Sequence, residues 1–123
     1  MPARTALLVD DDPSTADSVR ELLPWQQVKI ESTANADEAI DCLKKHNYCG
    51  LVLNLESADG RAADVLRHMS EANVAIPIVV IASAFPDSLR ELAIADSIKL
   101  VMGRPFDPSL LASMILGLCG LER

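Results

Sequence analysis

Short apolar runs alternate along this chain with longer segments in which apolar residues recur at helical spacing. The alternation predicts parallel strands joined by crossover helices, because a parallel connection needs about a dozen or more residues to return to the same end of a sheet. Right-handed crossovers favour a doubly wound α/β fold with a parallel sheet of order 2-1-3-4-5. The expected strands are residues 6–9, 28–32, 51–53, 78–81 and 99–102.

Helix signals separate these strands. Asp12-Pro13 and Asp107-Pro108 each combine an N-cap residue with a proline at the first helical position. The run 78–81 is the most apolar and predicts a strand that is covered on both faces. The five expected helices are residues 13–23, a segment from 37 onward, a segment after Gly60, residues 87–95 and residues 108–116.

The length of the chain suits one hydrophobic core. A chain of 123 residues lies in the usual range for a single domain. We therefore expect residues 1–123 to form one domain, either alone or as the N-terminal domain of a longer protein. Only 3% of the residues are aromatic, so aliphatic side chains must fill the core.

Charge and cysteine usage exclude several classes of protein. A formal net charge of −7 repels phosphate backbones and anionic lipids, so we expect no direct nucleic-acid or membrane partner. The first apolar run stops at Asp10, too early for a signal peptide or a membrane span. Cys42, Cys49 and Cys119 are odd in number and lack metal-ligand spacing, which predicts neither a disulfide framework nor a zinc site. These features fit a protein of the reducing cytoplasm.

Polar groups follow four of the expected strands. Because the carboxyl ends of parallel strands meet at one edge of a sheet, a site is expected in the crevice there. The groups are Asp10-Asp11-Asp12, Asn54, Ala82-Ser83 and Gly103-Arg104-Pro105-Phe106.

Four segments agree in order and spacing with one known family. They are Leu7-Leu8-Val9-Asp10-Asp11-Asp12-Pro13, the strand at 51–53 with Asp59-Gly60, Ile76-Pro77-Ile78-Val79-Val80-Ile81, and Arg104-Pro105-Phe106-Asp107. Together they resemble the receiver domain of bacterial response regulators, over nearly the whole chain. The resemblance implies a (βα)5 flavodoxin-like fold and a role in two-component signal transduction.

The resemblance also implies roles for the strand-end residues. In the family two acids help to hold Mg²⁺, an aspartate after strand three attacks the phosphodonor, and a Thr or Ser and a Lys bind the phosphoryl group. Hard oxygen ligands suit Mg²⁺, and a carboxylate is the nucleophile that yields an acyl phosphate. Asp10 and Asp11 match the acidic pair, and Asp12 matches a further acid often found beside it.

The reactive positions depart from the family pattern. Asn54 stands at the phosphoacceptor position, Ala82 at the Thr/Ser position, Arg104 at the Lys position and Val101 at the position of the switch aromatic. A neutral amide cannot form an acyl phosphate, so these departures predict a pseudo-receiver that is not phosphorylated. Ser83 lies one residue beyond Ala82, where strand alternation aims a side chain at the other face.

The charged groups of the crevice lead to further expectations. Arg104 presents a planar fork that suits a carboxylate, and we expect it to pair with Asp10, Asp11 or Asp12. Glu56 is either an ordinary loop carboxylate or a replacement metal ligand, in a loop from Asn54 to Asp59 that is about two residues shorter than is usual in the family and lacks its proline. Without the aspartate, we expect Mg²⁺ binding to be weak or absent at Asp10 and Asp11, and we expect no other cofactor.

One alternative belongs to a different class of protein. The strand end at Asp10 to Asp12 is also similar to that of haloacid-dehalogenase-type phosphohydrolases, with Asp10 as nucleophile and Asp12 as acid/base. Such an enzyme needs a lysine and a late acidic pair, whereas the last strand here ends in Gly103 and Arg104. A flavodoxin-like cofactor binder is disfavoured, because acids follow strand one where a phosphate would need a Gly-rich or hydroxyl-rich loop.

The favoured interpretation is a non-enzymatic interaction module in signal transduction or transcription control. By resemblance, its partners bind the face formed by helix four, strand five and helix five. We expect Leu89, Ile94 and Met114 to take part there, in a homodimer or against an output domain.

Overall fold

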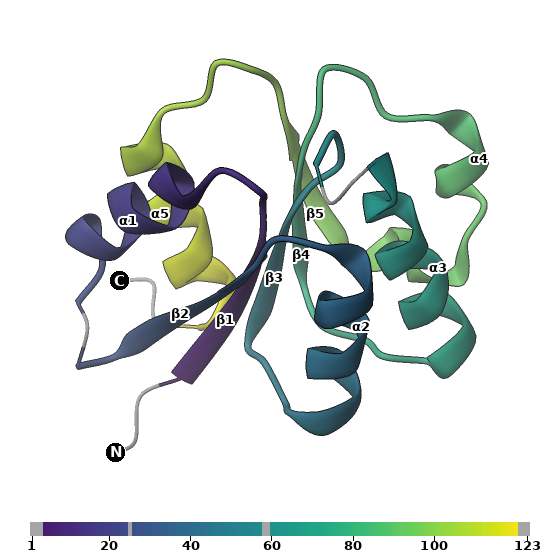
Figure 1. Cartoon of the computed structure of the whole chain (residues 1–123), viewed down its shortest axis with the longest axis horizontal. Helices are drawn as coiled ribbons and strands as arrows, with labels where there is room; N and C mark the ends of the chain where they lie inside the picture. The colour runs from purple at the N-terminus through teal and green to yellow at the C-terminus, as the bar shows by residue number, and fades with distance from the viewer. Residues whose placement is uncertain (1–3, 25, 58–59, 121–123) are drawn as a thin grey trace.

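The computed structural model describes residues 4–24, 26–57 and 60–120. Its strands form one parallel sheet of order β2-β1-β3-β4-β5 (Figure 1). The strands are β1 (Arg4–Val9), β2 (Val28–Thr33), β3 (Gly50–Asn54), β4 (Ile78–Ile81) and β5 (Ile98–Met102). The predicted flavodoxin-like sheet and its strand order are confirmed.

Helices cover both faces of the sheet (Figure 1). The first and last helices pack on one face and the middle ones on the other, so the central strands are covered on both sides. The helices are α1 (Pro13–Leu22), α2 (Ala36–Lys45), α3 (Ala62–Ala72), α4 (Asp87–Arg90), the 3₁₀ helix η2 (Ala93–Ser97) and α5 (Pro108–Leu118). None of the helices in the described ranges is long and apolar enough to cross a membrane.

Alternation along the strands divides the core into two layers. Leu7 and Leu51 pack against the side of α2 and α3, whereas Leu8 and Val52 pack against α1 and α5. All five residues of β3 are buried, as expected for the central strand of a sheet that is covered twice.

Two predicted helix caps hold the chain at the carboxyl edge of the sheet. The Asp12 side chain accepts a hydrogen bond from the backbone N–H of Ser14 at the start of α1. Asp107 does the same for Ser109 at the start of α5. Because each cap satisfies a backbone donor that the first helical turn leaves free, it fixes where the helix begins. The loops after β1 and β5 are thereby held at their helical ends.

The expected continuous helix over residues 87–95 is wrong. It is replaced by the single-turn α4 and by η2, with an extended Leu92 between them. Leu89 and Ile94 are both buried in the core. At 100° per residue they would lie about 140° apart on one α-helix, so the break lets both point inward. Their burial also overturns their expected role on a docking surface, while Met114 is only partly buried.

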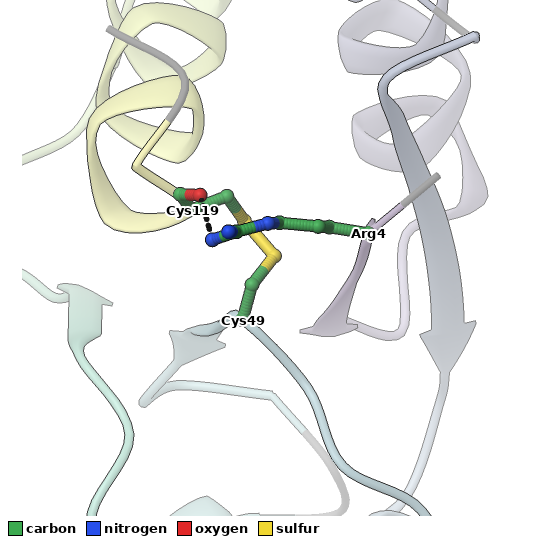
Figure 2. The surroundings of a disulfide bond; sticks show 3 residues. All are labelled: Arg4, Cys49 and Cys119. Carbon is green, nitrogen blue, oxygen red and sulfur yellow. Dashed lines mark hydrogen bonds between the residues drawn. A yellow bond between two sulfur atoms is a disulfide. The ribbon is translucent and has the colours of Figure 1, made fainter. Parts of the chain in front are cut away.

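The expectation of no disulfide is also wrong. Cys49 and Cys119 are joined by a disulfide across a sequence separation of 70 residues (Figure 2), and Cys42 is free. Spacing along the chain could not show this pair, because the sheet order brings the residue before β3 beside the C-cap of α5. The odd number of cysteines reflects one bonded pair and one free thiol.

Candidate functional site

A cleft of about 590 Å³ opens at the carboxyl edge of the sheet. It lies between the loops that follow β1, β3 and β5, where the sequence predicts the site. The cleft brings together Asp10, Asp11, Asn54 and Arg104, as expected. Its other lining residues are Asp12, Ser14, Thr15, Ser18, Glu56, Phe106 and Pro108.

The three acids after β1 have different environments. Asp10 is buried, and its Oδ1 accepts the backbone N–H of Asp12 at 2.9 Å. Asp11 is exposed. Asp12 accepts the Ser14 backbone N–H at 2.9 Å and the Ser14 hydroxyl at 2.7 Å. These hydrogen bonds hold the pKa of Asp12 below its usual range, with a smaller contribution from the charge of Arg104.

Asn54 ends β3 and is almost completely buried, with 2% of its surface exposed. Its Oδ1 accepts the backbone N–H of Glu56 at 3.0 Å, and its backbone carbonyl accepts the Ser57 hydroxyl at 3.0 Å. The side chain is therefore held by the tight turn that follows the strand. It presents an amide, which carries no negative charge and is not a nucleophile towards phosphorus.

Arg104 pairs with Glu56, not with the acids after β1. Its Nε lies 3.1 Å from Glu56 Oε1, which corrects the expected pairing with Asp10, Asp11 or Asp12. Asp10 and Asp12 each accept a backbone N–H of their own loop, and Asp11 is exposed. Sequence reasoning named Glu56 only as a loop carboxylate or a metal ligand, because the pairing depends on how the loop after β3 turns.

The expected direction of Ser83 is also wrong. Its hydroxyl donates to Glu56 Oε1 at 3.3 Å, so it points to the cleft side. Strand alternation no longer holds there, because β4 ends at Ile81. Ala82 is buried in the core with 3% of its surface exposed, and Val101 on β5 is 41% exposed. Glu56 thus accepts a hydrogen bond from a hydroxyl and forms an ion pair with a guanidinium.

The residues present do not fit a divalent-cation site of the usual kind. Within the described parts of the chain, no three His, Cys, Asp or Glu side chains stand together in a way that could hold a metal ion. One oxygen of Asp10 is occupied by a backbone N–H, Asn54 supplies a neutral oxygen that also accepts a backbone N–H, and Glu56 is neutralised by Arg104. A hard cation prefers several free anionic oxygens.

Hydroxyl groups of α1 are a part of the cleft that sequence reasoning missed. Thr15 and Ser18 line it together with Ser14. Residues three apart on a helix share a face, so the spacing of Thr15 and Ser18 after the Asp12 cap could have revealed them.

Comparisons with known proteins agree with this fold. The family model described as the response regulator receiver domain matches residues 6–116. The cell cycle transcriptional regulator CtrA of Caulobacter vibrioides is 26% identical over 100 residues, which is 81% of this chain and 43% of that protein. The chain thus spans less than half the length of this curated relative.

Solved receiver domains have the same architecture. The signal receiver domain of a putative Luxo repressor protein from Vibrio parahaemolyticus is 16% identical with a TM-score of 0.79, covering 96% of this chain and 91% of that one. A CheY-like receiver domain protein from Methanospirillum hungatei is also 16% identical, with a TM-score of 0.75 and coverage of 97% and 96%. These likenesses show the fold.

The phosphohydrolase alternative finds no support. It needs Asp12 as a free acid/base, whereas Asp12 caps α1. The family model covers residues 6–116, which include the strand ends that form the cleft. The chain belongs to the response regulator receiver domain family.

Proposed function

We propose that this domain is a pseudo-receiver that signals through protein contacts without being phosphorylated. The observation that carries the proposal is the buried amide of Asn54 at the phosphoacceptor position, held by the Glu56 N–H at 3.0 Å. Acyl-phosphate chemistry needs a carboxylate at this place. The exposed acid nearby, Asp11, lies on a different strand end and does not follow β3.

A carboxylate of the chain itself supports the same proposal. In the family a hydroxyl after β4 and a cation after β5 bind the phosphoryl group. Here Ser83 and Arg104 both contact Glu56 Oε1, at 3.3 and 3.1 Å. Glu56 thus takes up the donors that an incoming phosphoryl group would need.

The Glu56–Arg104 pair matters because it occupies the cleft, and it contributes little to the stability of the fold. Its side chains are 44% and 42% exposed, and an ion pair so open to water contributes about 0–1 kcal/mol. Its role in this proposal is to occupy the cleft with a fixed, neutralised pair. The missing hydroxyl at Ala82 and the missing ring at Val101 remove the other parts of a phosphorylation switch.

The partner surface is proposed on β5 and α5. Val101 and Leu110 are 41% and 49% exposed, and α5 carries no charged residue. These features favour contact with protein, and the net charge of −7 disfavours direct contact with DNA. Since CtrA is a transcriptional regulator more than twice the length matched, we propose that residues 1–123 act as the receiver part of a longer cytoplasmic regulator.

The test is intact mass after incubation with acetyl phosphate and Mg²⁺. We expect no mass change, because Asn54 offers no carboxylate. A conventional receiver treated in parallel is the positive control. A gain of one phosphoryl group that is lost on treatment with hydroxylamine would contradict the proposal.

A further inference from the structure

We propose that Cys49 and Cys119 form a redox-reversible disulfide that fixes the C-terminal end of α5 to the start of β3 when oxidised and releases it when reduced. The pair lies at the amino edge of the sheet, because Cys49 precedes β3. The cleft with Asn54 lies at the carboxyl edge. The proposal is therefore independent of whether the domain is phosphorylated.

Backbone hydrogen bonds hold each cysteine to its own side of the contact. The Cys49 N–H donates to the Thr5 carbonyl at 2.9 Å, and the Cys119 N–H donates to the Ile115 carbonyl at 3.0 Å. The Cα atoms are 4.7 Å apart, within the range that a disulfide spans without backbone movement. The thiols should thus remain neighbours after reduction, so the bond can form again.

Gly50 allows this close approach. A Cβ built on Gly50 would lie 3.0 Å from the side chain of Leu118, so the last turn of α5 rests directly on the first residue of β3. The Arg4 guanidinium adds a hydrogen bond to the Cys119 carbonyl (Figure 2). The disulfide, the Gly50–Leu118 contact and the Arg4 hydrogen bond together hold the end of α5 at the start of β3.

The chemistry of the compartment argues for a reversible bond. In a reducing cytoplasm, where we propose that the domain works, protein disulfides are rare and usually transient or redox-sensing. The cysteines are also unequally accessible: Cys119 is 1% exposed, whereas Cys49 is only partly buried. An attacking thiolate therefore reaches the Cys49 sulfur first.

An ordinary dithiol can reduce the Cys49–Cys119 bond by thiol–disulfide exchange. The reagent thiolate bonds to Cys49 Sγ, the Cys49–Cys119 bond breaks, and its electron pair leaves on Cys119 Sγ as a thiolate. The second reagent thiol then displaces Cys49 as a thiolate, and the reagent departs as a disulfide. The protein pair gains two electrons. A low-molecular-weight disulfide such as oxidised glutathione drives the reverse reaction.

Arg4 is assigned as the residue that favours the leaving sulfur. Its guanidinium donates a hydrogen bond to the carbonyl of Cys119. The positive charge of Arg4 therefore lies beside the residue whose sulfur becomes the thiolate. A nearby cation lowers the pKa of a thiol, and a leaving thiol of lower pKa departs faster.

The test uses the whole chain with Cys42→Ser, which removes the free thiol and keeps the pair. The protein is equilibrated in buffers with different ratios of reduced to oxidised glutathione. Free thiols are then alkylated, and the intact mass is measured. We expect the number of alkylated cysteines to pass from none to two across the ratios found in cells. A bond that stays closed in every buffer, or that never forms within one molecule, would overturn the proposal.

The release of α5 has its own readout. We expect reduction to lower the melting temperature by about 10 °C and to speed amide exchange in the last turn of α5, while residues around Asn54 keep their exchange rates. Cys49→Ser and Cys119→Ser should reproduce the reduced state under all conditions. Unchanged exchange in α5 would show that the bond releases nothing.

Arg4 is tested by kinetics. Arg4→Gln should slow reduction by dithiothreitol roughly three- to fivefold, and Arg4→Lys should restore most of the rate. Lys29→Gln removes a charge from the exposed face of β2 and is the matched control. Equal rates in Arg4→Gln and the parent would overturn the role of Arg4.

Discussion

At the scale of single residues, the cleft is defined by which carboxylates are present and which cation they face. Asp10 and Asn54 are both buried, but only Asp10 can carry a charge. Arg104 neutralises the charge of Glu56. Its charge also makes a small contribution to the lowered pKa of Asp12. The arrangement holds one buried acid without crowding a second one beside it.

An acid introduced at position 54 should therefore destabilise the fold. In Asn54→Asp, two buried carboxyls face the same cleft, and their repulsion and desolvation raise the pKa of one of them. An acid with a raised folded pKa binds more protons in the native state, so stability falls as the pH rises through that pKa. We expect a loss of about 1–3 kcal/mol at neutral pH that shrinks as the pH is lowered.

Urea unfolding at several pH values measures this effect. Asn47→Asp, at an exposed position between α2 and β3, is the control and should be nearly neutral. A variant Asn54→Asp as stable as the parent at neutral pH would mean that the cleft accommodates a second charge.

The exposure of the Arg104 pair leads to a second prediction. Arg104→Ala should change the free energy of unfolding by no more than about 1 kcal/mol, because the pair is screened by water. Arg90→Ala, which breaks an exposed pair with Asp87, should have an effect of similar size. Thermal melts of both variants make the comparison. A much larger loss of stability in Arg104→Ala than in Arg90→Ala would show that the Glu56–Arg104 pair stabilises the fold.

At the scale of elements, the strand pattern and the helix caps could be predicted because they depend on local chemistry. Alternating apolar runs and the Asp-Pro pairs at α1 and α5 led to the correct sheet order and helix starts. The break after α4 could not be read in this way, since it depends on burying Leu89 and Ile94 together. The pairings of Arg104 and Cys49 depend on chain turns and on α5, which spacing does not reveal.

The contact between β3 and α5 gives a prediction at this scale. Gly50→Ala should destabilise the protein by about 1–3 kcal/mol, because the added methyl group meets Leu118 Cβ, which is close to the helix backbone and cannot move freely. Gly103→Ala is the matched control, since a Cβ there has nothing within 4 Å. Equal unfolding midpoints for the two variants would mean that α5 shifts at little cost.

At the scale of the whole molecule, α5 connects the two edges of the sheet. Its start lies beside the cleft, which Phe106 and Pro108 help to line. Its end carries Cys119, bonded to the residue before β3. The helix therefore spans the distance between the cleft and the disulfide, and Leu110 on α5 and Val101 on β5 are exposed.

The last prediction concerns how much of the cleft must be rebuilt before phosphorylation moves β5 and α5. Asn54→Asp alone should be phosphorylated slowly, because Ala82 offers no hydroxyl and Arg104 stays paired with Glu56. Adding Ala82→Thr and Arg104→Lys should increase phosphoryl incorporation, since a hydroxyl and a compact ammonium then face the phosphoryl group. The conformational response should still be absent, because Val101 has no ring to turn inward and is already 41% exposed. Intact mass and amide chemical shifts of the single and the triple variant, with and without acetyl phosphate, separate the two effects. We expect shift changes to stay within the cleft, and changes that spread over β5 and α5 in Asn54→Asp alone would contradict the proposal that this domain lacks a phosphorylation switch.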